Sequence, residues 1–292
     1  MSSEGGWPAL PLDAWRETCD TLHLYAQIVG KIRLALAPGE PEWAHVTLYV
    51  TSRGLTTTPM PFGDRTFEIG FDFVEHALVI SLSDGRRLSL PLRPLPVCTF
   101  YEQLMEALKS LGIEPRIWPM PVEISEPIRF TDDSVHASYD PIFAHRFWQI
   151  LVLIDSAFKE HRAPFRRRHT PVQFFWGTFD LAYARFSGRP ATPPDQSVIM
   201  RNAMDAQEIC AGFWPGDQRF PEPALWCYAF PKPPGIEQAR IEPAAASWNS
   251  ALGEFILRYE DVRKARSPRQ AVLDFLTSTY RECATLAKWD DV

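Results

Sequence analysis

The chain has few cysteines and little positive charge. Its five cysteines are odd in number, widely spaced and free of any CxxC pair: Cys19, Cys98, Cys210, Cys227 and Cys283. This usage is typical of reduced, buried thiols and excludes a disulfide framework or a cysteine-based zinc site. The net charge of −6 argues against a general nucleic-acid binder, which needs a positive surface.

Long apolar runs are also missing, so the sequence predicts no membrane-spanning helix and no membrane partner. The first seven residues have neither a basic segment nor an apolar one, and we expect no signal peptide. Together with the reduced thiols, this predicts a cytoplasmic protein.

The sequence lacks GxGxxG, GxxxxGK[ST] and GxSxG, which argues against dinucleotide, P-loop and α/β-hydrolase sites. Its seven histidines show no HxH or HxxxH spacing, so no metal site follows from histidine pairs. The cofactor is therefore unknown, and a divalent metal held by carboxylates is the one candidate left open.

What the chain does contain is an internal echo within an aromatic-rich sequence of 292 residues, with 19 Phe, 10 Trp and 8 Tyr. Shifting residues 15–55 forward by 126 positions reproduces the apolar pattern, placing Leu22 on Trp148, Ile28 on Ile154 and Val46 on Val172. Such an echo predicts one supersecondary unit built twice, by internal duplication. Two similar pieces without common ancestry would give the same pattern.

Apolar periodicity predicts a helix, four strands and a helix in each half. The first half has helices over 13–37 and 97–111 and strands over 46–50, 67–73, 77–82 and 88–92. The second has helices over 141–159 and 272–286 and strands over 172–176, 208–213, 224–230 and 254–259. The fold class is therefore α+β, with antiparallel sheets, halves at 13–112 and 141–289, and a Pro-rich crossover at 113–140.

Several segments carry a resemblance to a known family: TLHxxxQIVGK from Thr21, LYVTxRGL from Leu48, FEIxFDF from Phe67, FFWGxFDLA from Phe174, RFSGR from Arg185 and GFWPG from Gly212. Together they resemble a bacterial family known only as a domain of unknown function. The resemblance covers essentially the whole chain and implies no activity. The family pattern has His before FFWG, whereas this chain has Gln173, which implies an altered site if that His is functional.

The most suggestive stretch runs from His169 to Arg189. Asp180 follows an apolar strand and precedes Arg185 and Arg189, so a carboxylate beside two guanidinium groups could orient an anionic substrate. A structural Asp–Arg pair next to an aromatic core is the plainer interpretation.

Glu68 and Glu208 occupy matching strand positions in the two halves, if the second is aligned at a shift of 140. Approaching carboxylates would separate into an acid and a base, or would hold a divalent cation together with Asp72. The alternative is the polar face of two half-exposed strands.

His23, Gln27 and Lys31 recur at four-residue spacing on one helix face, which is either the wall of a site or a solvated surface. The leading hypothesis is a small-molecule site, for an anionic ligand, in the cleft between the halves. Its catalytic candidates are Glu208, Glu68 and Asp180, and its binding candidates are Arg53, Arg185, Arg189, Gln173, Trp176, His23 and Lys31. The alternative is a non-catalytic ligand-sensing or protein-interaction module, so enzymatic activity and oligomeric state stay open.

Overall fold

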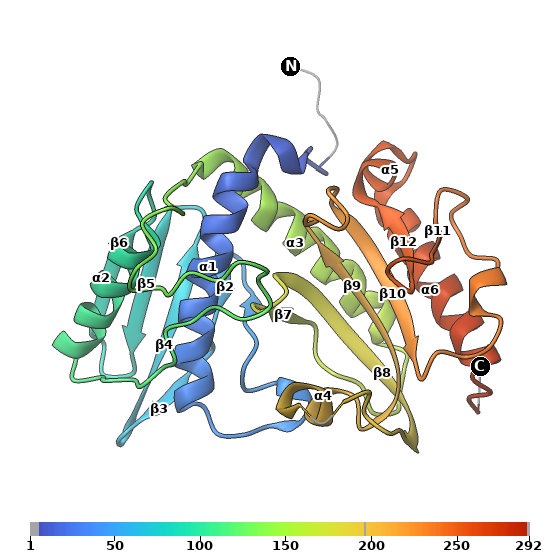
Figure 1. The fold of residues 1–292 in the computed structure, drawn as a ribbon, viewed down its shortest axis with the longest axis horizontal. Helices are drawn as coiled ribbons and strands as arrows, with labels where there is room; N and C mark the ends of the chain where they lie inside the picture. The colour runs from blue at the N-terminus through green and yellow to red at the C-terminus, as the bar shows by residue number, and fades with distance from the viewer. Residues whose placement is uncertain (1–5, 196, 291–292) are drawn as a thin grey trace.

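The computed structural model describes residues 6–195 and 197–290, which form two antiparallel sheets and the helices that cover them (Figure 1). The first sheet contains β1 (Tyr49–Val50), β2 (Gly54–Thr56), β3 (Met60–Phe62), β4 (Arg65–Asp72), β5 (Ala77–Leu82) and β6 (Arg87–Pro91). The second contains β7 (Gln173–Phe175), β8 (Asp180–Pro190), β9 (Ala206–Trp214), β10 (Ala224–Phe230), β11 (Ser247–Asn249) and β12 (Glu254–Arg258). Residues 1–5, which enter the signal-peptide expectation, lie outside the described part.

The strand orders of the two sheets correspond. The first runs β1-β2-β4-β5-β6, with β3 paired to β4, and the second runs β7-β8-β9-β10-β12-β11. The predicted α+β class with antiparallel sheets is confirmed. The division into 13–112, 113–140 and 141–289 stays a prediction, although each sheet falls within one of the two proposed halves.

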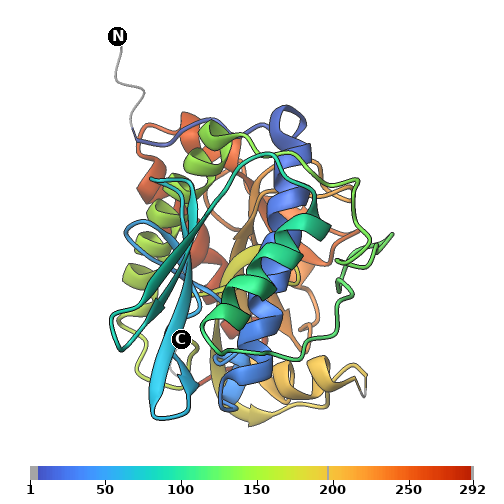
Figure 2. The same ribbon diagram turned by 90° about the vertical axis from the view of Figure 1, so that its left-hand side faces the viewer.

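Helices cover one face of each sheet. α1 (Leu12–Leu36) and α2 (Val97–Ser110) pack on the first sheet, and α3 (Pro141–Arg162) and α6 (Pro268–Leu286) pack behind the second (Figures 1 and 2). The short helices are η1 (Pro41–Trp43), α4 (Val198–Ala203), η2 (Ile236–Gln238) and α5 (Tyr259–Lys264). None of the helices in the described ranges is both long enough and apolar enough to cross a bilayer.

The buried stripes of α2 and α6 match position by position at a shift of 175. In α2 the stripe is Val97, Phe100, Leu104 and Leu108, and in α6 it is Val272, Phe275, Thr279 and Cys283. Side chains at this spacing lie on one helix face and pack together on a sheet. Both stripes lie within the helices that the sequence predicts over 97–111 and 272–286.

Strand pairing corrects the predicted match of Glu68 with Glu208. Leu55 pairs with Phe71 in the first sheet, and Leu181 pairs with Phe213 in the second, so β4 corresponds to β9 at a shift of 142. Glu208 then corresponds to Thr66, and Glu68 to Cys210. The predicted shift of 140 is wrong by two residues, because a two-residue slip preserves the alternation of a strand and leaves no trace in the apolar pattern.

The two halves touch through residues that are equivalent at the shift of 126. Leu48 and Phe174 exchange backbone hydrogen bonds of 2.9 and 2.8 Å, and Gln173 Nε2 donates to Thr47 Oγ1 at 3.1 Å. Contacts between equivalent positions are those that a local twofold relation would create. They support internal duplication, which stays a prediction.

β8 is the main element that the sequence did not predict. Its first seven residues are all buried, so the strand shows no alternation of apolar and polar residues. One set, including Leu181, Tyr183 and Arg185, faces α3 and α6. The other set, including Asp180 and Ala182, faces the open side of the second sheet, which no helix covers in Figure 1.

Candidate functional site

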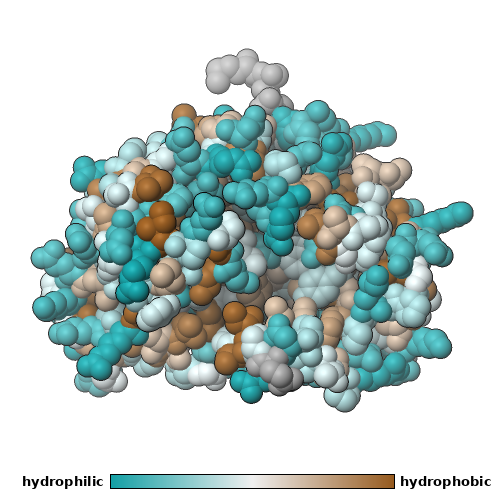
Figure 3. Space-filling model, viewed as in Figure 1, coloured by the Kyte–Doolittle hydropathy of each residue, from teal (hydrophilic) through white to brown (hydrophobic). Residues whose placement is uncertain are grey.

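The open face of the second sheet carries a separate apolar cluster. One row of paired residues crosses all six strands: Gln173, Ala182, Gly212, Trp226, Ile256 and Ser247. Small side chains in this row and in the next row, which includes Ala184 and Cys210, project little from the sheet and leave a shallow depression. Figure 3 shows this side of the molecule hollowed near its middle. Concave surfaces of this kind are where small molecules usually bind.

Aromatic rings form one part of the hollow. Trp226 and Tyr228 lie on alternate positions of β10 and stack with ring centroids 5.6 Å apart at an angle of 6°. A Cβ atom on Gly212 would lie 2.2 Å from the Trp226 ring, so glycine is needed for the ring to cross β9. Flat aromatic surfaces bind sugar rings and organic cations.

Asp180 is the first residue of β8 and is only 8% exposed. Its carboxylate accepts a hydrogen bond from Thr178 Oγ1, and within the described ranges no basic side chain forms an ion pair with it. Burial is the main reason that the pKa of Asp180 is raised to about 7; the Thr178 hydrogen bond opposes this shift, and the charges of Glu123 and Glu254 contribute to it. A carboxyl group with such a pKa exchanges protons near neutral pH.

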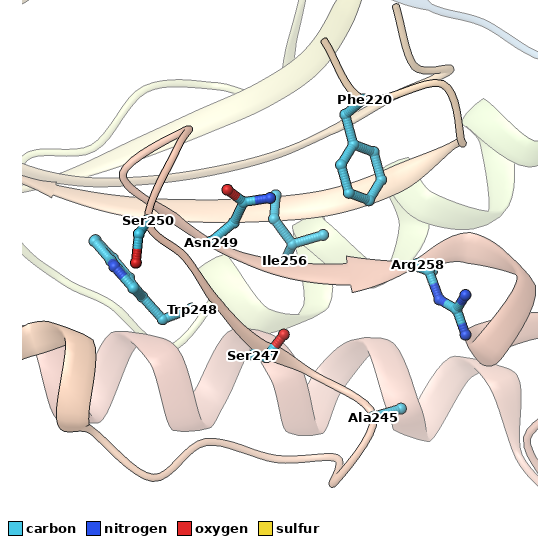
Figure 4. Close-up of a pocket in the computed structure, with 8 residues that line it drawn as sticks. All are labelled: Phe220, Ala245, Ser247, Trp248, Asn249, Ser250, Ile256 and Arg258. Atoms are coloured by element: carbon cyan, nitrogen blue, oxygen red, sulfur yellow. The ribbon is translucent and has the colours of Figure 1, made fainter.

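Glu254 is the first residue of β12 and lies on the open face, two residues before Ile256. It pairs with Asn249 of β11, and burial raises its pKa to about 7, while the charge of Arg219 opposes this shift. Asn249 and Ile256, on either side of it, line a groove of about 370 Å³ together with Phe220, Ser247, Trp248 and neighbouring residues (Figure 4). The groove joins the open face at its β11 edge.

Glu208 lies on β9 on the same face and is 4% exposed. Tyr228 donates a hydrogen bond of 3.0 Å to its Oε1, and burial raises the pKa of Glu208 to about 7. Cys210, two residues further on, has a thiol pKa that is raised by burial and then by the charge of Glu208. The thiol is therefore neutral at pH 7, not a nucleophilic thiolate.

The family-like segments of α1 and of the β7–β8 turn meet beside Asp180. Trp176 stands against Gly30, whose Cβ would lie 2.2 Å from the indole, and donates to Val46 O at 2.8 Å. The Lys31 ammonium lies 5.8 Å from the centre of the same ring. Gln27 is 0% exposed, so the interpretation of this helix face as a solvated surface is wrong.

His23 lies at the same junction. Its Nε2 donates to Gly177 O at 2.9 Å, and its ring stacks on Phe179. Burial lowers the pKa of His23 to about 4, so it is neutral at pH 7.

The structure does not bring the predicted arginines to Asp180. Arg185 points to the helix side, where it donates to His161 O and lies over the Tyr280 ring. Arg189 pairs with Asp290 at 3.2 Å. Successive strand residues face opposite sides, so the odd spacing of Asp180 and Arg185 separates them.

Arg53 and Glu68 belong to the first sheet. Arg53 donates to Asp72 at 2.6 Å, and Glu68 accepts a long contact of 3.5 Å from Thr56 Oγ1. Glu68 and Glu208 thus have separate partners on different sheets. Across residues 6–195 and 197–290, no three His, Cys, Asp or Glu side chains are grouped so that they could hold a metal ion.

Gln173, which replaces the expected His, is 0% exposed. Its Nε2 donates to Thr47, whereas its buried Oε1 has no hydrogen-bond partner. An unsatisfied buried acceptor is costly and marks this position as unusual. The structure adds Glu123, Glu254, Tyr228 and Cys210 to the residues expected here. None of them belongs to a chemical motif, and they come together only through strand pairing and the path of the crossover.

All five cysteines are free and four are buried, in line with the expected reduced thiols. Neither a curated protein nor a solved structure matches the chain. A family model matches residues 7–292, described as a family of unknown function (DUF5996). Because the match spans nearly the entire sequence, the chain belongs to this family, which confirms the resemblance to a domain of unknown function.

Proposed function

We propose that the protein binds a small molecule on the open face of the second sheet and that Asp180 exchanges a proton with it. The observation that carries the proposal is a buried carboxyl group that has no ion-pair partner among the described residues, with Glu123 and Glu254 nearby and a pKa of about 7. Buried charges in proteins are normally paired, and unpaired titratable groups with shifted pKa values gather at functional sites.

The charge of the site favours a neutral, hydroxyl-rich ligand or a cationic one. Arg185 and Arg189, expected to neutralise an anion, are engaged elsewhere. The other groups near this face include carboxyls, the stacked Trp226 and Tyr228 rings, and Arg219, which already pairs with Asp217 at 2.7 Å. Carboxylates and aromatic faces both attract ammonium groups, and both hold hydroxylated rings. The two arginines that favoured an anionic ligand are therefore not available at this site.

The test is a thermal-shift screen at pH 7 with spermidine, choline, arginine and glucose, against citrate and phosphate. A ligand that binds only the native state raises Tm by mass action. We expect a saturable rise with a member of the first group, which disappears in Asp180→Asn. Glu68→Gln is the matched control, because Glu68 lies on the corresponding outward face of the first sheet, and it should leave the shift unchanged. Stabilisation by citrate or phosphate alone, or binding that survives Asp180→Asn, would contradict the proposal.

A further inference from the structure

The crossover between the halves inserts a carboxyl group into the β7–β8 turn. A Cβ atom on Gly177 would lie 2.0 Å from Glu123 Oε2 and 3.8 Å from Val122 Cγ2. The absence of a side chain at Gly177 is what lets the Glu123 carboxyl lie against the turn that leads into Asp180. Glu123 as a residue is exposed, but its carboxyl group points inward, and the loss of water there raises its pKa.

Gln27 of α1 fixes the backbone beside Glu123. Its Nε2 donates to Val122 O at 2.8 Å, and its Oε1 accepts from Val122 N at 2.9 Å. A side-chain amide that makes both bonds to one residue acts as a β-strand partner would and leaves that residue little freedom. Glu123 follows directly, with a left-handed φ of 56°, a conformation that is unfavourable for a non-glycine residue.

His23 connects this clamp to the turn. Its Nε2 donates to Gly177 O at 2.9 Å and therefore only packs against Gln27 Nε2, 3.1 Å away, since both nitrogens are donors; its ring stacks on Phe179 with centroids 4.8 Å apart. Phe179 is also left-handed, with a φ of 61°. Glu123 and Phe179 are thus two non-glycine residues in this conformation, and α1 contacts the chain at Val122 and at Phe179 through Gln27 and His23.

We propose that Glu123 is the second carboxyl group of the Asp180 site, held there by the positioning residues His23, Gln27 and Gly177. The inference deepens the proposed function and rests on it. It accounts for why segments of α1, the crossover and the β7–β8 turn converge. In this inference, Gln27 and Gly177 position the Glu123 carboxyl group in addition to packing against the turn.

The chemical consequence is a pair of carboxyl groups that bind as a unit. Two like charges disfavour each other, so one group keeps its proton while the other ionises. The protonated member donates a hydrogen bond and the ionised member accepts one. The other groups that act on Asp180 are Glu254 from β12, through its charge, and Thr178, through its hydrogen bond. Arg219 acts on both glutamates.

Gly177→Ala is the sharpest test of this arrangement. The backbone at Gly177 lies outside the left-handed region, so alanine fits it, and the only close obstacle is the mobile end of Glu123. The substitution should displace that carboxyl group and leave the fold intact. The measurement is the titration midpoint of the Asp180 carboxyl carbon by NMR, in wild type, Gly177→Ala, Glu123→Gln and the double variant.

We expect the Asp180 midpoint to fall by at least about half a pH unit in each single variant. The double variant should fall no further, because both changes remove the same group. Gly39→Ala, where no atom lies within 4 Å of the new Cβ, and the exposed Glu126→Gln on the same crossover are the controls, and neither should move the midpoint.

An unchanged midpoint in Gly177→Ala or in Glu123→Gln would overturn the inference, as would shifts that add in the double variant. The same NMR spectra show whether each variant is folded. Should Gly177→Ala fail to fold, Gln27→Leu, which releases Val122, must produce the same fall or the inference is wrong. Failure of the ligand screen with the expected midpoints would instead count against the proposed function alone.

Discussion

Asp180 holds its proton because the folded chain gives the ionised form too little water and no cation. Its pKa is about 7 in the folded protein, against about 4 in an unfolded chain. Between these two values the folded state binds a proton that the unfolded state has released. Stability therefore falls as pH rises through this window, and the full cost is present above pH 7. Residues that lower stability at physiological pH are common at functional sites, where activity and stability trade off.

Asp180→Asn should therefore stabilise the protein at pH 8 and have little effect at pH 4. Three pKa units correspond to an upper limit of about 4 kcal/mol, and we expect a gain of about 1–3 kcal/mol because the structure relaxes around the charge. Asparagine keeps the size of the side chain and can still accept the Thr178 hydrogen bond. The measurement is urea unfolding at both pH values. Equal stability of the two proteins at pH 8 would show that the carboxyl is not buried as described.

Asp64→Asn serves as the control for this experiment. The Asp64 side chain is 96% exposed and lies 3.7 Å from Arg65. Asp64→Asn should leave the free energy of unfolding nearly unchanged at both pH values, because an exposed ion pair contributes little.

At the scale of elements, strands with one solvated face were predictable and the strand whose residues are buried on both faces was not. β5 (Ala77–Leu82) alternates strictly in burial, and the sequence predicts it residue for residue. β8 is buried on both faces over seven residues, so its apolar pattern resembles a short buried helix or no element at all. The missing strand also affected the predicted site. Because β8 was not predicted, Asp180 and Arg185 were placed together, whereas strand geometry directs them to opposite faces.

Other parts of the site could not be predicted for a different reason. Glu123 lies in the Pro-rich crossover, where no periodicity relates it to Gly177. Glu254 begins a strand that was predicted. Whether its carboxyl group lies near other acidic side chains or in solvent depends on the order of the strands in the sheet, which the sequence does not show. Asp180, His23, Gln27 and Trp176 could be named, because side chains of these types in short motifs stand out without any tertiary information. Their mutual contacts come only from the fold.

A matched pair of glycines tests the role of the open face in packing. Gly70 in β4 corresponds to Gly212 in β9, since each lies between equivalent partners in the two sheets. A Cβ at Gly212 would lie 2.2 Å from the Trp226 ring and 2.9 Å from Leu181 O. At Gly70 the one atom within 4 Å is Leu55 O, at 3.6 Å.

We expect Gly212→Ala to destabilise the protein by about 1–3 kcal/mol, because the indole must leave its place. Gly70→Ala should be neutral or slightly stabilising, since alanine has less freedom to lose on folding than glycine. Guanidinium unfolding measures both, and near-ultraviolet circular dichroism reports the Trp226 environment. Equal effects of the two substitutions would mean that the Trp226 ring is not held across Gly212.

At the scale of the whole molecule, the two halves share a plan but differ in their outward faces. In the first sheet the row equivalent to Ala182, Gly212, Trp226 and Ile256 is Thr56, Gly70, Val79 and Ser89. That row is partly or fully exposed, and two of its four residues are polar, as expected for the solvated side of an antiparallel sheet. In the second half the equivalent row is buried and holds small, aromatic and aliphatic residues, with the Asp180 and Glu208 carboxyl groups on the same face. Such an asymmetry between equivalent surfaces places the candidate site in the second half, not symmetrically between the halves.

The halves are joined by side chains that cross from one to the other, and Trp176 is one of them. It belongs to the β7–β8 turn but lies against Gly30 of α1 and donates to Val46 O. Trp176→Ala should lower the free energy of unfolding by about 3–5 kcal/mol, as for other large-to-small core changes. Because the indole packs on both halves, amide hydrogen exchange should accelerate in the core strands of both sheets by similar factors. Trp118→Ala, at a position 65% exposed, is the control and should leave exchange unchanged. Faster exchange in the second sheet alone would show that the halves are stabilised independently, and that α1 is fixed to the first sheet without the help of Trp176.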